Sequence, residues 1–309
     1  MASPIRNTIY YFPRILRDSL KDMLANDPLR MAGATAFFTT FALPPILVMI
    51  IQLLGLAFNK RSVSKQLLTH LADIIGKESV HQVAMVLVAF RKLAQNWTIT
   101  ILGFLFLVFV ATTLFKIIKS SINQLWTLRV PKSPGMWFGM RNRLQSIFVI
   151  IIAGILFALG LLAEGLQALL GKYLHEFSPI LAFYLNNVLS YVISIAIVTA
   201  WFGTMFRYLP DGRPQWNIAM AGGLLTSILF HIGKLILHWL LSYSNITTVY
   251  GASASIVLLL LFVFYCALIL YYGASFTRAW AIWKGKPIDP LPHAVKYEWA
   301  EVGSEIKGI

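Results

Sequence analysis

The chain has 309 residues, of which 58% are hydrophobic and only 12% charged, and its 26 Lys and Arg residues outnumber 12 Asp and Glu residues. Typical soluble domains are roughly 45–50% apolar and about 25% charged. This composition excludes an ordinary soluble protein and predicts an all-α, polytopic integral membrane protein. A net charge of +14 would suggest a nucleic-acid partner in a soluble protein. In a membrane protein the position of the bases matters more, and we expect no nucleic-acid partner.

Residues 1–30 are predicted to form an amphipathic segment at the cytoplasmic membrane surface. Ile9, Phe12, Leu16 and Met23 fall on one helical stripe, and the basic side chains lie largely elsewhere. A helix with this pattern lies in the plane of the interface with its apolar face toward the lipid.

Six stretches are long and apolar enough to cross a bilayer, which takes about 20 residues of helix. They define a transmembrane domain at residues 31–283 and lie near 31–58, 97–118, 144–170, 179–206, 216–242 and 252–283. The segment 59–96, between the first two spans, predicts two amphipathic helices over the outer face, with a solvated helical hairpin as the alternative. Residues 284–309 are expected to form a cytoplasmic tail.

The basic residues favour an orientation with both termini in the cytoplasm. Most Lys and Arg residues then lie on the inner side, as the positive-inside rule requires, and segments 59–96 and 243–250 lie outside. The predicted inner loop at residues 116–143 carries six bases and no acid. Membrane lipids with anionic headgroups are therefore expected partners at the cytoplasmic face, although the topology rule alone also explains these bases.

Two consecutive prolines, Pro44 and Pro45, interrupt the first predicted span. They remove the backbone donors that the carbonyls of Thr40 and Phe41 would accept in a regular helix. One interpretation is a helix break at which Pro44 begins a second half-helix, leaving the hydroxyls of Thr39 and Thr40 beside a midplane cavity. The other is a simple kink that neighbouring side chains satisfy.

Titratable side chains inside predicted spans are costly to bury and are functional by default. His231, Lys234 and His238 follow an i, i+3, i+7 spacing and share one face of the fifth span. Glu164 lies at a comparable depth in the third span. We expect Glu164 and Lys234 to form an ion pair, with the two histidines on the same polar path. The alternative is that Lys234 snorkels toward the interface and that Glu164 ends its helix.

The start of the last span forms another candidate site, made of Tyr250, Gly251, Ser253 and Ser255. Its backbone donors would face the outer side and could receive an anion. Close helix packing through the small residues is the alternative account.

Polar residues also follow a helical spacing on the fourth span, at Asn186, Asn187, Ser190 and Ser194. Hydrogen bonds between helices explain them without a ligand.

The sequence contains none of the enzyme motifs that were sought. Its six histidines form no H-x-H or H-E-x-x-H pattern, and G-x-S-x-G and G-x-x-x-x-G-K-[ST] are absent. A metal-dependent nuclease needs closely spaced ligands for its ions. We therefore expect no enzymatic activity, no cofactor and no metal site.

A family pattern is carried by three passages: ATAFFTTFALPPILV at residues 34–48, YLPDGRPQWNIAMAGG at 208–223 and VYGASASIVLLLLFVFYCALILYYGASFTR at 249–278. In these passages the chain resembles the YihY/BrkB family of bacterial inner-membrane proteins, formerly mislabelled ribonuclease BN. It departs from the family pattern at Ala42, Phe262 and Ser275. The resemblance implies a six-helix protein of the bacterial inner membrane and transfers no catalytic residues.

Two functions are therefore predicted as alternatives. The first is a transporter or translocator for an unknown small or lipid substrate of the cell envelope, either a lipid or an amphipathic anion. The second is a non-transporting envelope scaffold that binds lipids or partner proteins. Ribonuclease activity is expected to be absent.

Overall fold

The computed structural model describes residues 4–54, 59–75, 80–81, 83–85, 88, 97–131, 148, 151–152, 155–156, 158–160, 179–243 and 254–298. Within this part the fold is a bundle of long helices: α2 (Pro28–Leu54), α5 (Trp97–Leu125), α7 (Pro179–Tyr208), α8 (Trp216–Tyr243) and α10 (Ala254–Trp283). Two shorter helices accompany them: α1 (Pro4–Leu24) and α3 (Lys60–Ile75).

Three described helices are long and apolar enough to cross a membrane, at Val188–Tyr208, Trp216–Leu237 and Val257–Trp283. Helices α2 and α5 occupy the positions of the first two predicted spans. The third predicted span, at residues 144–170, lies mostly outside the described residues. An all-α membrane fold therefore agrees with the prediction, whereas the number of six spans stays a prediction.

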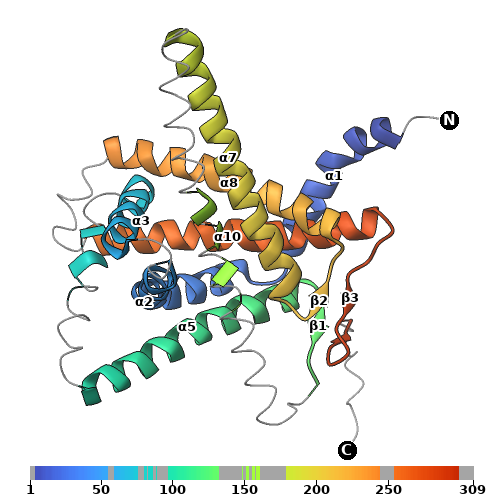
Figure 1. The fold of residues 1–309 in the computed structure, drawn as a ribbon. Helices are drawn as coiled ribbons and strands as arrows, with labels where there is room; N and C mark the ends of the chain where they lie inside the picture. Colours follow the sequence, from blue (N-terminus) through green and yellow to red (C-terminus); the bar gives the residue numbers. More distant parts are fainter. Residues whose placement is uncertain are drawn as a thin grey trace, which may run out of the picture.

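Helix α10 is the central helix of the bundle and packs against α2, α8, α1 and α5 (Figure 1). Its most apolar window is 56% buried, against 22% for α7 and 33% for α8. Large apolar side chains such as Tyr191, Val192, Leu235 and Ile236 are exposed on α7 and α8. Helix α10 therefore supplies much of the core, while α7 and α8 supply exposed apolar surface of the kind that suits contact with lipid.

Helices α7 and α8 approach each other closely through two glycines. A Cβ atom placed on Gly223 would lie 2.6 Å from the carbonyl oxygen of Thr199 and 2.7 Å from the backbone nitrogen of Gly203. Small residues at a membrane helix interface let two backbones come together and gain van der Waals contact. The glycines therefore set the spacing of this helix pair.

Helix α1 packs against the end of α10. The sequence had predicted a helix that lies in the plane of the membrane interface, so this packing is an additional contact. Ile15 and Met23 are buried, and the Tyr272 hydroxyl donates a hydrogen bond to the carbonyl of Leu16 at 3.1 Å. Arg278 Nη1 lies 3.2 Å from Asp22 Oδ2. Of the predicted stripe, Met23 is buried and Leu16 half-buried, whereas Phe12 is exposed and the buried Ile15 lies outside the stripe.

Helix α3 is amphipathic, as predicted for the first part of segment 59–96. Val63 and Leu67 are buried in the same core cluster as residues of α2, α5 and α10. The predicted second helix of this segment lies largely outside the described residues.

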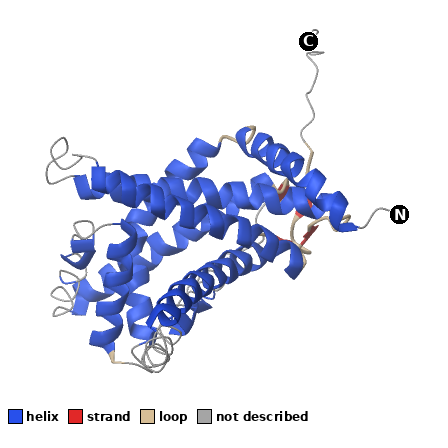
Figure 2. Cartoon of the chain, turned by 90° about the horizontal axis from the view of Figure 1, so that it is seen from above, coloured by secondary structure: helices blue, strands red, loops and turns tan. Residues whose placement is uncertain are grey.

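Four two-residue strands lie at one end of the bundle, β1 (Leu128–Arg129), β2 (Gly212–Arg213), β3 (Asp289–Pro290) and β4 (Val295–Lys296). β1 pairs with β4, and β2 pairs with β3, both antiparallel. Helices α5, α7 and α10 finish at this end (Figure 1), and Figure 2 shows the strands at the end of the bundle where the first helix also lies. We call it the Asp211 end, because the buried side chain of Asp211, between α7 and β2, lies there.

The C-terminal segment folds back onto the Asp211 end and is not simply a tail. Gly285 has a φ of 64°, and the backbone N–H groups of Gly285 and Lys286 bond to the carbonyls of Ile282 and Ala281. This is a Schellman cap, in which a glycine in the left-handed region ends the helix and reverses the chain. The cap directs residues 286–298 toward β1 and β2.

Candidate functional site

Polar side chains connect α7 and α8 inside the apolar bundle. Ser194 Oγ lies 3.1 Å from His231 Nε2, and the Ser227 hydroxyl donates a hydrogen bond to the carbonyl of Ile195 at 3.1 Å. Ser194 was predicted to bond between helices, and the structure confirms this. These two bonds join α7 to α8 and place His231, a residue of the predicted polar path, at the contact between the helices.

The hydrogen bonds of His231 indicate which ring nitrogen carries a proton. Nδ1 lies 2.8 Å from the carbonyl oxygen of Ser227, and a carbonyl can only accept. Nδ1 therefore donates, and in the neutral ring Nε2 accepts a hydrogen bond from the Ser194 hydroxyl.

Lys234 lies one turn beyond His231 on α8 and is half-buried. Within the described residues it makes no ion pair with a carboxylate. Its predicted partner Glu164 lies outside the described residues, and the side chain of His238 does as well. The structure thus brings His231 and Ser194 together, while the Glu164–Lys234 pair stays a prediction.

The predicted break in the first span is not a break in the structure. Helix α2 continues from Pro28 to Leu54 through Pro44 and Pro45. The hydroxyls of Thr39 and Thr40 donate to the carbonyls of Thr35 and Ala36 at 2.7 and 2.9 Å. Two prolines remove only two backbone bonds, and packing against α5 and α10 holds the helix on either side. Of the two interpretations, the continuous helix excludes two half-helices and leaves the simple kink.

The predicted site at the start of the last span is mostly beyond the described part of the chain. Tyr250, Gly251 and Ser253 lie outside the described residues, and Ser255 lies in the first turn of α10. The anion-binding and packing accounts both stay open.

The Asp211 end contains a buried polar network that sequence reasoning missed. Asp211 is 1% exposed, and its Oδ1 lies 2.7 Å from Lys119 Nζ and 2.8 Å from His293 Nε2. The Asn123 amide donates to Oδ2 at 2.7 Å, and the backbone N–H of Asp211 donates to Asn123 Oδ1 at 2.9 Å. The network therefore joins α5, the α7–α8 connection and the C-terminal segment.

The charge of Asp211 is stabilised by its neighbours. Burial by itself raises the pKa of the carboxyl group, but hydrogen bonds from Lys119 and His293 and the positive charge of Lys119 outweigh burial. The pKa of Asp211 therefore lies below its ordinary value of 3.8. The carboxylate stays ionised at neutral pH and holds the three elements together.

One sequence signal pointed to this network. Asp211 is one of only three acids between residues 100 and 250, and it stands among bases in the passage YLPDGRPQW. A lone carboxylate next to a span is a candidate partner for a buried base. Its partners lie 82 and more residues away along the chain, so the pairing itself was not visible.

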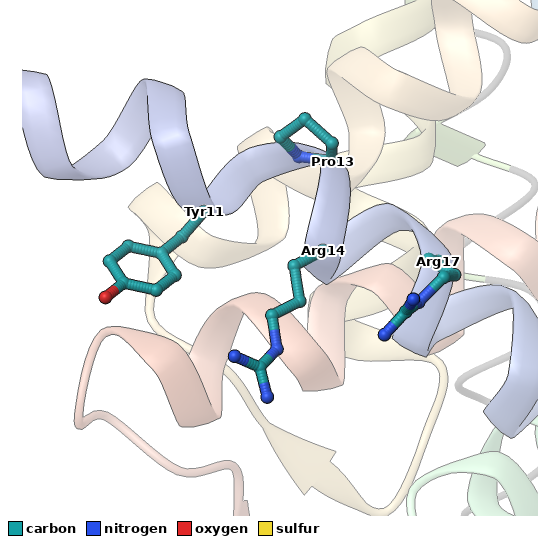
Figure 3. A pocket seen from close by; sticks show the side chains of 4 residues that line it. All are labelled: Tyr11, Pro13, Arg14 and Arg17. Carbon is teal, nitrogen blue, oxygen red and sulfur yellow. The ribbon is translucent and has the colours of Figure 1, made fainter.

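An open groove of about 460 Å³ lies on α1 and is lined by Tyr11, Pro13, Arg14 and Arg17. Figure 3 shows the side chains of Tyr11, Arg14 and Arg17 on the side of the helix away from the Pro13 ring. Arg14 and Arg17 lie 3.8 and 3.7 Å from the carboxylate of Asp18. The groove is therefore a basic surface that is partly neutralised by its own helix.

Comparison with known proteins identifies relatives of the whole bundle. A UPF0761 membrane protein of Saccharophagus degradans is 23% identical over 281 residues, which cover 91% of this chain and 63% of the relative. A UPF0761 membrane protein of Legionella pneumophila is 25% identical over 301 residues, covering 94% and 68%. A third, from Paraburkholderia xenovorans, is 25% identical over 259 residues, covering 81% and 56%.

The chain thus spans about three fifths of the length of the curated relatives that it matches. No solved structure matches it significantly. The family model described as virulence factor BrkB matches residues 19–296, which include α2, α5, α7, α8, α10 and every member of the Asp211 network. The chain is therefore a membrane protein that belongs to the BrkB family.

Proposed function

We propose that the protein crosses the bacterial inner membrane six times, with both termini and the Asp211 end in the cytoplasm. The positive-inside distribution of Lys and Arg supports this orientation, and so does the position of α1 and the C-terminal segment at the same end of the bundle.

Cysteine labelling tests this topology in a Cys266→Ser background. A cysteine introduced at Ser133 should react only after the membrane is opened. Selective labelling of that cysteine from outside would contradict the orientation.

The proposed function is the translocation of a lipid or an amphipathic anion of the cell envelope. The observation that carries this proposal is the polar path in an apolar helix pair, where His231 bonds to Ser194 and Lys234 lies half-buried one turn away. Ionisable side chains in spans commonly mark the route of a substrate or a proton.

The test is lipid movement in proteoliposomes that contain the full chain and a fluorescently labelled phospholipid. A reducing agent outside the vesicles bleaches only labels in the outer leaflet, so translocation appears as bleaching beyond that fraction. We expect Lys234→Met and Glu164→Gln each to reduce the rate, whereas Leu235→Met on the lipid-facing side of α8 should leave it unchanged.

The double variant separates a transport path from a scaffold. If Glu164 and Lys234 pair, removal of one partner strands a charge, and removal of both restores much of the folding. Restored stability without restored activity supports a path. Restored stability with restored activity supports the alternative, a non-transporting envelope scaffold in which the pair is structural. If Lys234 only snorkels, Lys234→Met is nearly silent in both measurements.

Ribonuclease activity stays excluded in this proposal. The purified protein, free of contaminating nucleases, should show no metal-dependent RNA cleavage, because the sequence offers no closely spaced ligand cluster for the metal ions. Turnover that one histidine or carboxylate substitution abolishes would overturn this.

A further inference from the structure

Arg129, Arg207 and Arg213 at the Asp211 end make no ion pair with any carboxylate in the described part of the chain. Of these three, Arg207 and Arg213 also stack on aromatic rings. Arg207 lies in the last turn of α7, and Arg213 lies in β2. The other described arginines of this end include Arg278, which pairs with Asp22. Arg207 and Arg213 therefore carry two positive charges that the described protein does not neutralise directly.

Aromatic rings hold both guanidinium groups in place. The Cζ atom of Arg207 lies 5.0 Å from the ring centroid of Trp216, and that of Arg213 lies 5.1 Å from the ring centroid of Tyr208. Arg207 also lies 5.9 Å from the Tyr208 ring. A guanidinium stacked on aromatic faces is attracted to them and loses less freedom when it binds an anion.

Arg207 also has one buried N–H donor, its Nε, without an acceptor in the described part of the chain. Its Nη1 donates a hydrogen bond to the carbonyl of Pro214, whereas its Nε is buried and has no hydrogen-bond partner within the described residues. A buried donor without a partner costs free energy until an acceptor satisfies it. A phosphate oxygen is a strong acceptor for an arginine.

These residues stand at the level of lipid headgroups. Tyr208 is the last residue of the apolar window of α7, and Trp216 is the first of the window of α8. Tyrosine and tryptophan are typical of the boundary between hydrocarbon and water. The exposed ring of Phe148 lies 5.7 Å from that of Tyr208 and extends the apolar surface beside the arginines.

Two described acids lie near these arginines in the fold. Asp211 is already engaged by Lys119, His293 and Asn123. Asp289 faces Arg213 across the β2–β3 pair, but the structure shows no ion pair between the two residues. The cluster thus keeps a net positive charge, with one exposed acid at its edge.

We propose that Arg207, Arg213, Tyr208 and Trp216 form a binding site for the phosphate of an anionic phospholipid headgroup in the leaflet at the Asp211 end. The two guanidinium groups bind the phosphate oxygens, Trp216 and Tyr208 contact the glycerol region, and Phe148 lies beside the acyl chains. This site goes beyond the proposed translocation path between α7 and α8 and does not require transport.

The experiment measures lipid binding to the full chain by native mass spectrometry from detergent, with added phosphatidylglycerol. We expect the apparent Kd of Arg207→Gln/Arg213→Gln to rise about tenfold or more, because two charge-assisted contacts are lost. The matched control is Arg61→Gln, an exposed arginine of α3, which should stay within about twofold of the parent. A double variant that also stays within twofold would overturn the site.

Arg207 also bonds to the carbonyl of Pro214, so its replacement affects folding as well as binding. Two single variants that spare Arg207 separate these effects. Arg213 is exposed, so Arg213→Gln should keep the parent unfolding midpoint and still weaken binding about threefold. Asp289→Asn removes the facing acid and should bind at least as tightly as the parent. Unchanged binding in Arg213→Gln, or weaker binding in Asp289→Asn, would contradict the proposal.

Two further probes identify the source of the phosphate. Phosphatidylcholine tests the need for net negative charge, and inorganic phosphate tests the need for acyl chains. Preferential binding of phosphatidylglycerol supports a lipid site, whereas displacement of the lipid by millimolar inorganic phosphate would overturn it in favour of a free-phosphate site. Because the measurement is of binding, a failure of translocation in proteoliposomes leaves it unaffected.

Discussion

The ammonium of Lys119 lies 2.7 Å from the carboxylate of Asp211, and the two side chains are 9% and 1% exposed. This contact joins the last turns of α5 to the connection between α7 and α8. Both charges have been taken out of water, so each depends on the other. Removal of one partner leaves an uncompensated buried charge, which costs more than the pair itself contributes.

The first prediction concerns this pair. Lys119→Met should lower the free energy of unfolding by about 3–5 kcal/mol if the carboxylate stays ionised. The reason is that the buried Asp211 carboxylate loses the positive charge of the Lys119 ammonium. The measurement is the unfolding midpoint in detergent. Lys119→Met/Asp211→Asn should recover part of the loss, since neither charge is then stranded.

Lys116→Met is the matched control for this substitution, because Lys116 lies one turn earlier on α5 and is exposed. It should leave the midpoint almost unchanged. If Lys119→Met behaves like Lys116→Met, water reaches the pair and the network is not a stabilising one.

The second prediction concerns pH. The pKa of Asp211 is lower in the folded protein than its ordinary value of 3.8, so the folded state binds this proton less tightly than the unfolded state does. The resulting stabilisation is fully present above pH 3.8 and is lost as the pH falls through the lower pKa of the folded protein. The unfolding midpoint of the parent should therefore fall in that acidic range.

Asp211→Asn isolates this contribution, because asparagine does not titrate. Its midpoint should be lower than that of the parent at neutral pH and should change less between pH 5 and pH 3, a range chosen to bracket the ordinary value of 3.8. An equal acid dependence in both proteins would show that other carboxylates govern the acid transition.

The third prediction concerns the glycine contact between α7 and α8. Gly223→Ala places a Cβ atom 2.6 Å from the carbonyl oxygen of Thr199, so the two backbones must separate. Overpacking of this kind costs about 1–3 kcal/mol. The expected result is a lower unfolding midpoint, together with slower translocation if the polar path between the same helices is used.

Gly33→Ala serves as the control, because a Cβ atom at Gly33 meets no atom within 4 Å. Alanine is favoured over glycine in a helix by about 0.5–1 kcal/mol, so this variant should be as stable as the parent or slightly more stable. A stabilising effect of Gly223→Ala would contradict the close contact of the backbones.

The fourth prediction concerns the C-terminal segment. His293→Ala removes the hydrogen bond to Asp211 Oδ1, although the strand pairs and the bond from Leu291 N–H to the carbonyl of Asp211 at 2.8 Å remain. The segment should open more often, and trypsin should cleave after the exposed Lys284 faster than in the parent. The measurement is the rate of appearance of the shortened chain.

His81→Ala is the control for the proteolysis experiment, since His81 is exposed and does not belong to the Asp211 end. Its cleavage rate should equal that of the parent. Equal rates for His293→Ala and the parent would show that the strand pairs alone hold the segment.

Composition and periodicity were sufficient for the helical class of this protein and for the positions of most long helices. A bilayer requires long apolar segments whatever their neighbours are, so α7, α8 and α10 were visible as predicted spans. Helical spacing alone also predicted that α1 is a helix with one apolar side, although the buried residue Ile15 lay outside the predicted stripe. At Ser194, a small polar residue in a span predicted an interhelical bond, and the bond to His231 is present.

Contacts between distant segments were decided by the tertiary structure alone. The second span was predicted to end near residue 118, whereas α5 continues to Leu125 and carries Lys119 against Asp211. The predicted tail is held to the bundle because His293 reaches the same carboxylate. The helix continues through Pro44 and Pro45 because neighbouring helices support it. Sequence spacing determines which face of a helix is polar, but a buried charge is stable only beside a partner, and the fold alone selects that partner.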